Sequence, residues 1–228
     1  MMLDDVANLE LVRSRRRTVE LRVFPDGRAQ VRAPQRMALR DIEAFVRERR
    51  DWLAQKQAEF AQRPTPPVPR FEDGAEHWLL GRSVPLRVIP ARRRRVGLST
   101  DGLQVMTDCQ RPDTVERLLE NWYRAQARVL FEQLIDQHFP FFQQRGYPRP
   151  LLTIRKMRSR WGSLSSRGGM SLNLLLLKAP LPLVEYVVIH ELCHLQEQNH
   201  GAGFKALMDE LLPDWKQRRQ QLNGLTYL

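Results

Sequence analysis

Three of the chain's five histidines lie within eleven residues, in the stretch VVIHELCHLQEQNH. His190 and His194 are four residues apart, so on a helix their rings share one face and can reach the same metal ion. Glu191 projects beside that face, where a carboxylate can act on a water molecule without binding the metal itself. The pattern H-E-x-x-H therefore predicts a catalytic metal centre with Glu191 as its acid/base group.

A catalytic zinc ion needs three protein ligands and one open position, so a third donor must come from elsewhere in the chain. We predict His200, because the segment QNHGAG can end the helix and turn the chain back towards the metal. Zn²⁺ is the expected cofactor, with another divalent transition metal as the alternative, because imidazole also binds nickel, copper and iron. The competing third ligands are three downstream carboxylates, Glu197, Asp209 and Glu210. We interpret three further residues as structural, namely His77, His138 and Cys193.

The elements that must position this cluster are predicted from the pattern of apolar residues in the carboxyl-terminal half. The residues before the first histidine, LVEYVVI, are apolar enough to be buried, so the imidazoles and the glutamate would lose hydration without a metal to bind. The expected elements are a long helix from Asp113 to before RGYPRP, strands over 151–157 and 169–177 around the loop RSRWGSLSSRGG, the histidine helix from Pro182 and a final helix from Gly203.

The amino-terminal half has more strand-like patterns than helical ones. They predict a hairpin over 17–33, an amphipathic helix from Ile42 to Phe60, a proline-rich connector over 62–70, and strands within 77–89 and 95–107. The fold class is therefore α+β with a β-rich amino-terminal half. We expect a domain boundary between residues 108 and 109, so that 109–228 forms the catalytic domain.

Composition favours a protein of the cytoplasm with anionic partners. The formal net charge is +11, and arginine runs occur at Arg13–Arg17 and Arg92–Arg95. We interpret these runs as solvated strand faces, with a nucleotide or nucleic acid as the alternative partner, because no aromatic residues interleave with them. With only two cysteines, we expect no disulfide framework. We also expect no export signal at the amino terminus and no membrane span, because the apolar runs are interrupted by polar residues and prolines.

Several motifs together resemble those of one family, the YgjP-like metallopeptidases, which are related to the SprT-like and WLM groups of zincin proteases. They are RKMRSRWGS, MSLNLLL, YVVIHELCHL and the NH that precedes Phe204, with RSRRRTVELRV, DGRAQVRAP and LLGRSVPLRV in the amino-terminal half. The resemblance covers nearly the whole chain. Two positions depart from it: Leu164 stands where the family usually has cysteine, and Lys205 stands where an aromatic residue is usual.

The resemblance implies a zincin-like catalytic domain with a divalent metal held by His190, His194 and His200. With Glu191 as general base, a metal-activated water would attack an amide carbonyl, which makes the chain a zinc metallopeptidase acting on polypeptides. The predicted substrate-binding residues are Arg158, Arg160 and Tyr186, as donors to the oxyanion, and Asn173, in a strand that could pair with a peptide.

Two alternatives keep the metal, and they change either the substrate or the role of the metal. In the first, the substrate is a phosphoanhydride such as a nucleoside triphosphate, bound by Arg155, Arg158 and Arg160. In the second, the chain is a basic nucleic-acid-binding module with a structural metal. Against that module, structural zinc normally has four protein ligands, and this cluster offers three histidines.

Overall fold

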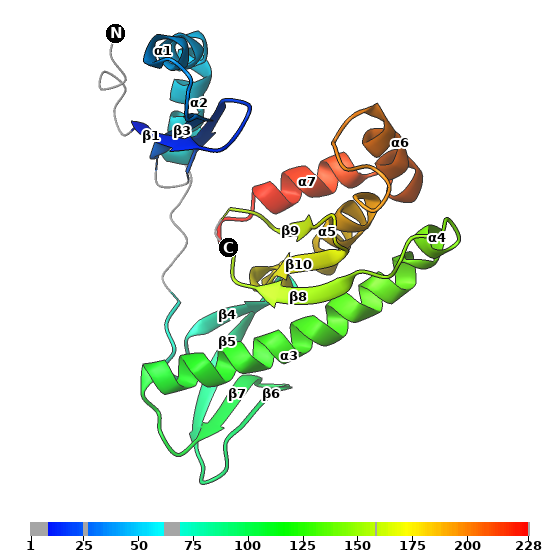
Figure 1. Cartoon of the computed structure of the whole chain (residues 1–228). Helices are drawn as coiled ribbons and strands as arrows, with labels where there is room; N and C mark the ends of the chain where they lie inside the picture. Colours follow the sequence, from blue (N-terminus) through cyan, green and yellow to red (C-terminus); the bar gives the residue numbers. More distant parts are fainter. Residues whose placement is uncertain (1–8, 25–26, 62–68, 158, 228) are drawn as a thin grey trace. The chain divides into compact units, whose positions relative to one another are not determined.

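The computed structural model describes residues 9–24, 27–61, 69–157 and 159–227. The chain divides into two compact units, Met1–Pro66 and Pro67–Leu228 (Figure 1). Each unit has a hydrophobic core of its own. The predicted connector over 62–70 lies outside the described residues except for its last two positions.

The first unit consists of a small mixed sheet and two helices. Its elements are β1 (Leu9–Ser14), β2 (Glu20–Val23), β3 (Ala29–Pro34), α1 (Leu39–Glu48) and α2 (Arg50–Ala61). The sheet order is β1-β3-β2, in which β2 and β3 form the predicted antiparallel hairpin and β1 adds a parallel strand that was not predicted. Alternate residues of β3 meet α1 in the core, as the burial of Val31 and Ile42 shows. The predicted single helix is interrupted at Arg49, which leaves the helical conformation.

The arginine run at Arg13–Arg17 has partners inside this unit. The Arg13 guanidinium donates hydrogen bonds to three backbone carbonyls, including that of Met37 at 2.8 Å. Arg16 forms an ion pair with Glu20 at 2.8 Å. Arg13 lies on β1, and Arg16 lies half-buried in the turn after it.

The second unit contains two sheets that one long helix connects. Its elements are β4 (Glu76–Leu79), β5 (Arg82–Pro90), β6 (Arg95–Ser99), β7 (Gly102–Thr107), α3 (Pro112–His138), α4 (Pro140–Gln143), β8 (Leu151–Arg155), β9 (Gly162–Leu164), β10 (Gly169–Asn173), the 3₁₀ helix η2 (Leu174–Lys178), α5 (Leu181–Cys193), α6 (Ala202–Leu211) and α7 (Trp215–Asn223). The sheets have the orders β4-β5-β7-β6 and β8-β10-β9. Figure 1 shows α3 running past both of them. The α+β class is confirmed.

The core of this unit extends across the boundary expected between residues 108 and 109. Leu103 and Val105 of β7 lie in the same buried cluster as Val115 and Leu119 of α3. The division between the compact units lies instead at Pro66 and Pro67. The two divisions differ because β4–β7 and the carboxyl-terminal elements share one core.

Three local features of the second unit differ from the sequence prediction. The loop before β10 contains the short strand β9, which pairs antiparallel to β10 and places Gly162 opposite Leu172. The predicted strand 169–177 ends at Asn173, since Leu174–Lys178 is a 3₁₀ helix. The final helix is two helices, α6 and α7, separated at Pro213. Within the described ranges, no helix combines the length and apolar character that crossing a membrane requires.

Candidate metal centre

Helix α5 is buried on nearly all sides, and its carboxyl-terminal end carries the first two histidines. Pro180 precedes the helix in an extended conformation, and His194 is its C-cap. The chain then turns back through hydrogen bonds from the N–H groups of Leu195 and Glu197 to carbonyls in the last turn of α5. We expected QNHGAG to end the helix with a residue in the left-handed conformation. Asn199 and Gly201 instead have negative φ angles, so the chain reverses without such a residue.

This reversal brings the three histidines together. The candidate ligand atoms of His190, His194 and His200 all lie within 4.8 Å of one another. The Nε2 atoms of His190 and His200 are 3.0 Å apart, and the three ring centroids are separated by 4.7 to 5.1 Å. Phe204, buried on α6, packs against all three rings at centroid distances of 4.7 to 4.9 Å.

The donors fit a tetrahedral metal ion. Zinc–imidazole bonds near 2.1 Å place the nitrogens of a tetrahedral site about 3.4 Å apart, which falls within the spacing of this cluster. The Nδ1 atom of His194 lies 2.8 Å from the Glu197 carbonyl, and a carbonyl only accepts, so Nδ1 carries the proton and Nε2 keeps its lone pair for a metal. Burial, followed by the charges of His194 and His200, lowers the pKa of His190 to about 3, which keeps that ring neutral and able to coordinate.

Glu191 is a buried carboxylate beside this cluster. Only 4% of the residue is exposed, and its Oε2 atom has no hydrogen-bond partner in the described part of the chain. Burial raises the pKa of Glu191 to about 8, opposed by a hydrogen bond from the Leu164 backbone and then by the charge of Arg160. A Cβ atom on Gly162 would lie 2.5 Å from Oε1, so β9 approaches the carboxylate this closely only because residue 162 is glycine. The carboxylate at the end of the histidine cluster therefore has a defined position.

Asn173 lies inside the protein and not in a cleft. It is 2% exposed, and its side-chain amide donates to the carbonyls of Met157 and Arg160 at 2.8 and 3.1 Å and accepts from the Leu175 N–H at 3.1 Å. The expected pairing of its strand with a peptide is wrong, because β10 is the central strand with neighbours on both sides. The free edge beside α5 belongs to β9, which the sequence prediction did not include.

The other predicted substrate contacts differ in how close they come to the cluster. The ring of Tyr186, one turn before His190, is edge-on to it at a centroid distance of 5.8 Å, and burial raises the pKa of this phenol. Arg160 is exposed and close enough for its charge to act on Glu191. Arg158 lies outside the described residues.

The competing carboxylate ligands stay outside the histidine cluster. The only grouping of metal-binding side chains found within the described ranges is the three histidines. Asp209 accepts a hydrogen bond from the Trp215 indole at 2.7 Å, and Glu197 contributes its backbone carbonyl to the orientation of His194. The buried Cys193 contacts the sulfur of Met208 at 3.4 Å, as expected for a packing residue.

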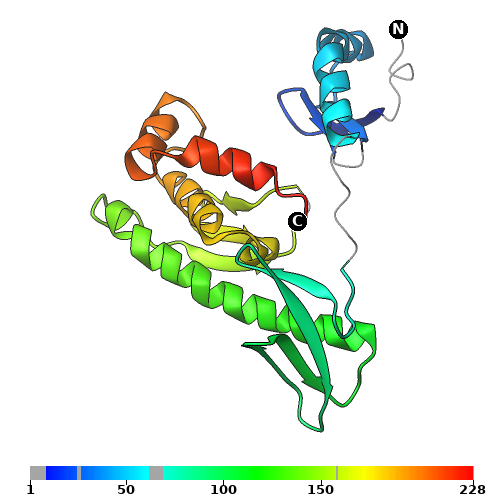
Figure 2. The ribbon, with the colours of Figure 1, turned by 180° about the vertical axis from the view of Figure 1, so that it is seen from behind.

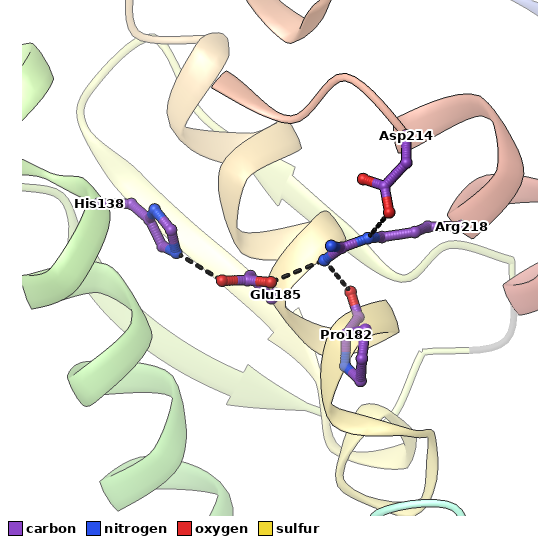
Figure 3. A network of polar contacts seen from close by, with 5 residues as sticks. All are labelled: His138, Pro182, Glu185, Asp214 and Arg218. Carbon is purple, nitrogen blue, oxygen red and sulfur yellow. Dashed lines mark hydrogen bonds and ion pairs between the residues drawn. The ribbon is translucent and has the colours of Figure 1, made fainter. Parts of the chain in front are cut away.

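A polar network connects α5 to two other helices (Figure 3). The Glu185 carboxylate accepts from Arg218 of α7 at 2.6 Å and lies 3.0 Å from Nε2 of His138 of α3. Arg218 also donates to Asp214 at 2.8 Å and to the Pro182 carbonyl at 3.0 Å. His138 is thus a structural residue of a network, and α7 is held along α5, as Figure 2 also shows.

Arg219, which the sequence prediction missed, is the next residue along α7. It lies four residues after the buried Trp215 and three before the buried Leu222, on the face of α7 that turns towards the core. Its guanidinium is exposed, forms no ion pair within the described ranges, and lowers the pKa of His190 and His200 by its charge. No motif marks this residue, because its proximity to the histidines arises from helix packing.

In this mixed α+β domain, a buried helix carries H-E-x-x-H and a returning loop adds a third imidazole. This combination defines a zincin-like metallopeptidase. The description "YgjP-like, metallopeptidase domain" belongs to the family whose model matches residues 17–225, so the chain belongs to the YgjP-like metallopeptidases. The family is that of metal-dependent proteases.

Two solved structures are similar to part of the chain. The metallopeptidase zymogen abylysin of Pyrococcus abyssi has 23% sequence identity and a TM-score of 0.36 over 40% of this chain and 90% of that one. The metallopeptidase zymogen jannalysin of Methanocaldococcus jannaschii has 16% identity and a TM-score of 0.36 over 41% of this chain and 93% of that one. No curated protein matches the chain.

Replacing the third histidine tests the cluster as a metal site. His200→Ala is expected to weaken zinc binding at least about a hundredfold, because two imidazoles alone cannot close a three-ligand site. Competition titration against a chromogenic chelator measures the affinity. His77→Gln removes a histidine of β4, outside the cluster, and should bind zinc as the wild type does. Wild-type affinity in His200→Ala would show that this ring is not a ligand.

The contact between Gly162 and Glu191 is tested by adding one methyl group. Gly162→Ala is expected to displace the carboxylate and reduce hydrolysis of an unstructured polypeptide about tenfold or more, with metal content unchanged, since the new Cβ would clash with Oε1. Gly97→Ala is the matched control, because a Cβ on that glycine of β6 meets nothing within 4 Å. Equal rates for the two variants would contradict the role given to this contact.

Proposed function

We propose that the chain is a zinc-dependent metallopeptidase that cleaves polypeptides with Glu191 as general base. The observation that carries the proposal is the convergence of three imidazoles beside a buried carboxylate whose Oε2 atom has no hydrogen-bond partner among the described residues. Three ligands leave one coordination position open, which is the arrangement of catalytic zinc sites and not of structural ones. Another divalent transition metal is the alternative cofactor, because the donor set is all imidazole.

The three histidines would hold the ion through one nitrogen each, and His194 through Nε2. A metal ion bound there supplies a Lewis acid that lowers the pKa of water towards neutrality and polarises a carbonyl group. Phe204 limits the movement of the three rings, and the Glu197 carbonyl fixes the tautomer of His194. The chain's own contribution is therefore a rigid, partly desolvated set of neutral donors.

Glu191 would move the proton during the reaction. Its Oε2 atom is free to accept a proton from the attacking water and to donate it to the leaving amine. A carboxyl group in an apolar environment exchanges protons closer to neutral pH than a solvated one does, which suits both steps. Gly162 and the Leu164 backbone keep the carboxylate in place while it does so.

A polypeptide substrate can approach along β9. This strand lies at the edge of its sheet and beside α5, so its unpaired backbone groups can bind an extended segment close to Glu191. Arg160 and Arg219 place two exposed guanidinium groups near the site, and Tyr186 adds a phenol. These groups are candidates for stabilising the oxyanion, and Arg219 is the one whose charge reaches two of the metal-binding rings.

The proposed compartment is the cytoplasm. Both cysteines, Cys109 and Cys193, are free thiols, which agrees with a reducing environment.

The geometry gives less support to the two alternative functions. No contact in the described structure favours a phosphoanhydride as substrate, and the three-histidine cluster lacks the fourth protein ligand of a structural zinc site. Polypeptide hydrolysis remains the function that the geometry supports best.

The role of Glu191 can be separated from metal binding. Glu191→Gln keeps the size of the side chain but removes its ability to accept a proton, so hydrolysis of unstructured polypeptides should fall at least about a hundredfold while zinc content stays constant. Parallel assays with nucleoside triphosphates show whether the same group serves phosphoanhydride hydrolysis. Unchanged rates in both assays would reject Glu191 as the base.

The role of Arg219 predicts a change in turnover and not in metal content. Arg219→Met retains the aliphatic stem and removes the charge, so kcat is expected to fall about tenfold with little change in KM. Lys216→Met removes another exposed cation from α7 and should leave kcat unchanged. A kcat of Arg219→Met equal to that of the wild type would remove this residue from the proposed site.

A further inference from the structure

A cavity of about 660 Å³ in the second unit contains none of the residues of the metal centre. It lies between the amino-terminal half of α3, strand β4, the 3₁₀ helix η2 and the start of the loop after β8. Much of its lining is apolar, with Phe71, Leu119, Met157 and Leu174 among the contributing residues. Its volume is within the range of sites that bind small molecules.

One lysine of this cavity is held on a rigid part of the backbone. The carbonyl of Lys178 accepts a hydrogen bond from the Gly81 N–H at 2.9 Å, and the Leu177 carbonyl accepts one from Leu80 at 2.8 Å. Gly81 has a positive φ, and a Cβ there would lie 2.7 Å from Pro180, so the β4–β5 turn fits closely against the end of η2. The backbone of Lys178 is therefore held in a fixed position.

The polar groups on the β4 side of the cavity already have partners. The Tyr123 hydroxyl donates to the Trp78 carbonyl at 2.7 Å. Nε2 of His77 lies 2.9 Å from the Arg70 carbonyl, to which it donates. These hydrogen bonds fix the two rings, and they already satisfy the groups that could otherwise bind polar atoms of a ligand.

Of the charged groups of the cavity, some have partners in the protein and one does not. Lys156 forms an ion pair with Glu120, which also accepts from Arg124 at 2.9 Å. Glu116 lies at the exposed rim. Lys178 forms no hydrogen bond through its amine and no ion pair within the described ranges, and its Nζ atom lies over the ring of Tyr123, 5.9 Å from the centroid. Burial, and then the charge of Lys156, lowers the pKa of this lysine.

We propose that this cavity binds a small carboxylic acid, with the carboxylate at the amine of Lys178 and an apolar body between Phe71 and Leu174. A partly desolvated ammonium group without a counter-ion is costly, and an incoming carboxylate supplies the missing charge. The apolar walls exclude a ligand that is charged along its whole length. The site is independent of the metal and of the proposed hydrolysis.

Calorimetric titration of the full-length protein with phenylbutyrate tests the site. Phenylbutyramide has nearly the same shape without the charge, so the wild type should bind the acid at least about tenfold more tightly than the amide. Lys178→Met keeps the apolar stem and should bind the two compounds about equally. Because this change removes an unpaired charge, it leaves folding intact, which a thermal unfolding curve verifies.

Two comparisons make the result specific to this cavity. Lys216→Met, which removes an exposed lysine on α7, should keep the wild-type preference for the acid. Methyl NMR of methionine-labelled protein should show the Met157 signal shifting as phenylbutyrate is added. The proposal is overturned if phenylbutyrate shows no saturable binding to the wild type, or if Lys178→Met retains the preference for the acid.

Discussion

The burial of α5 is the constraint on which the catalytic half of the molecule depends. A helix packed on nearly all sides stabilises the core, but it also removes water from His190 and Glu191, and each loses hydration free energy as a result. The chain offers these groups few protein partners, since Oε2 of Glu191 has none within the described residues and Nε2 of His190 meets only Nε2 of His200, at 3.0 Å. A bound cation is the group that would compensate this cost, so the fold and the metal centre have to be understood together.

The network of Glu185 explains how so small a site keeps its geometry. One carboxylate of α5 interacts with His138 of α3 and with Arg218 of α7, so three helices meet at a half-buried polar contact (Figure 3). Such a contact contributes more to the relative orientation of the helices than to net stability, because the desolvation of its charges offsets much of their attraction. The orientation of α7 in turn determines where Arg219 lies relative to the histidines.

The parts of the site that the sequence predicts are those that depend on local spacing. H-E-x-x-H requires only a helix, and the return of His200 requires only a turn of a few residues after it. The contact of Gly162 with Glu191 depends on the pairing of β9 with β10, and a three-residue strand has too few positions to show alternation. The short apolar run after Asn173 was predicted as strand and is a 3₁₀ helix, because periodicity does not distinguish the two over so few residues.

Asn173 contacts the backbone on both sides, at the cavity of Lys178 and beside Glu191. Its side chain holds the backbone of Met157, which lines the cavity, and that of Arg160, whose charge reaches Glu191. Coupling between two sites needs an element with two alternative arrangements, and a buried amide with bonds to both backbones favours one. A carboxylate bound at Lys178 would therefore leave the bonds of Asn173 to Met157 and Arg160 in place, without shifting Glu191 relative to the histidines.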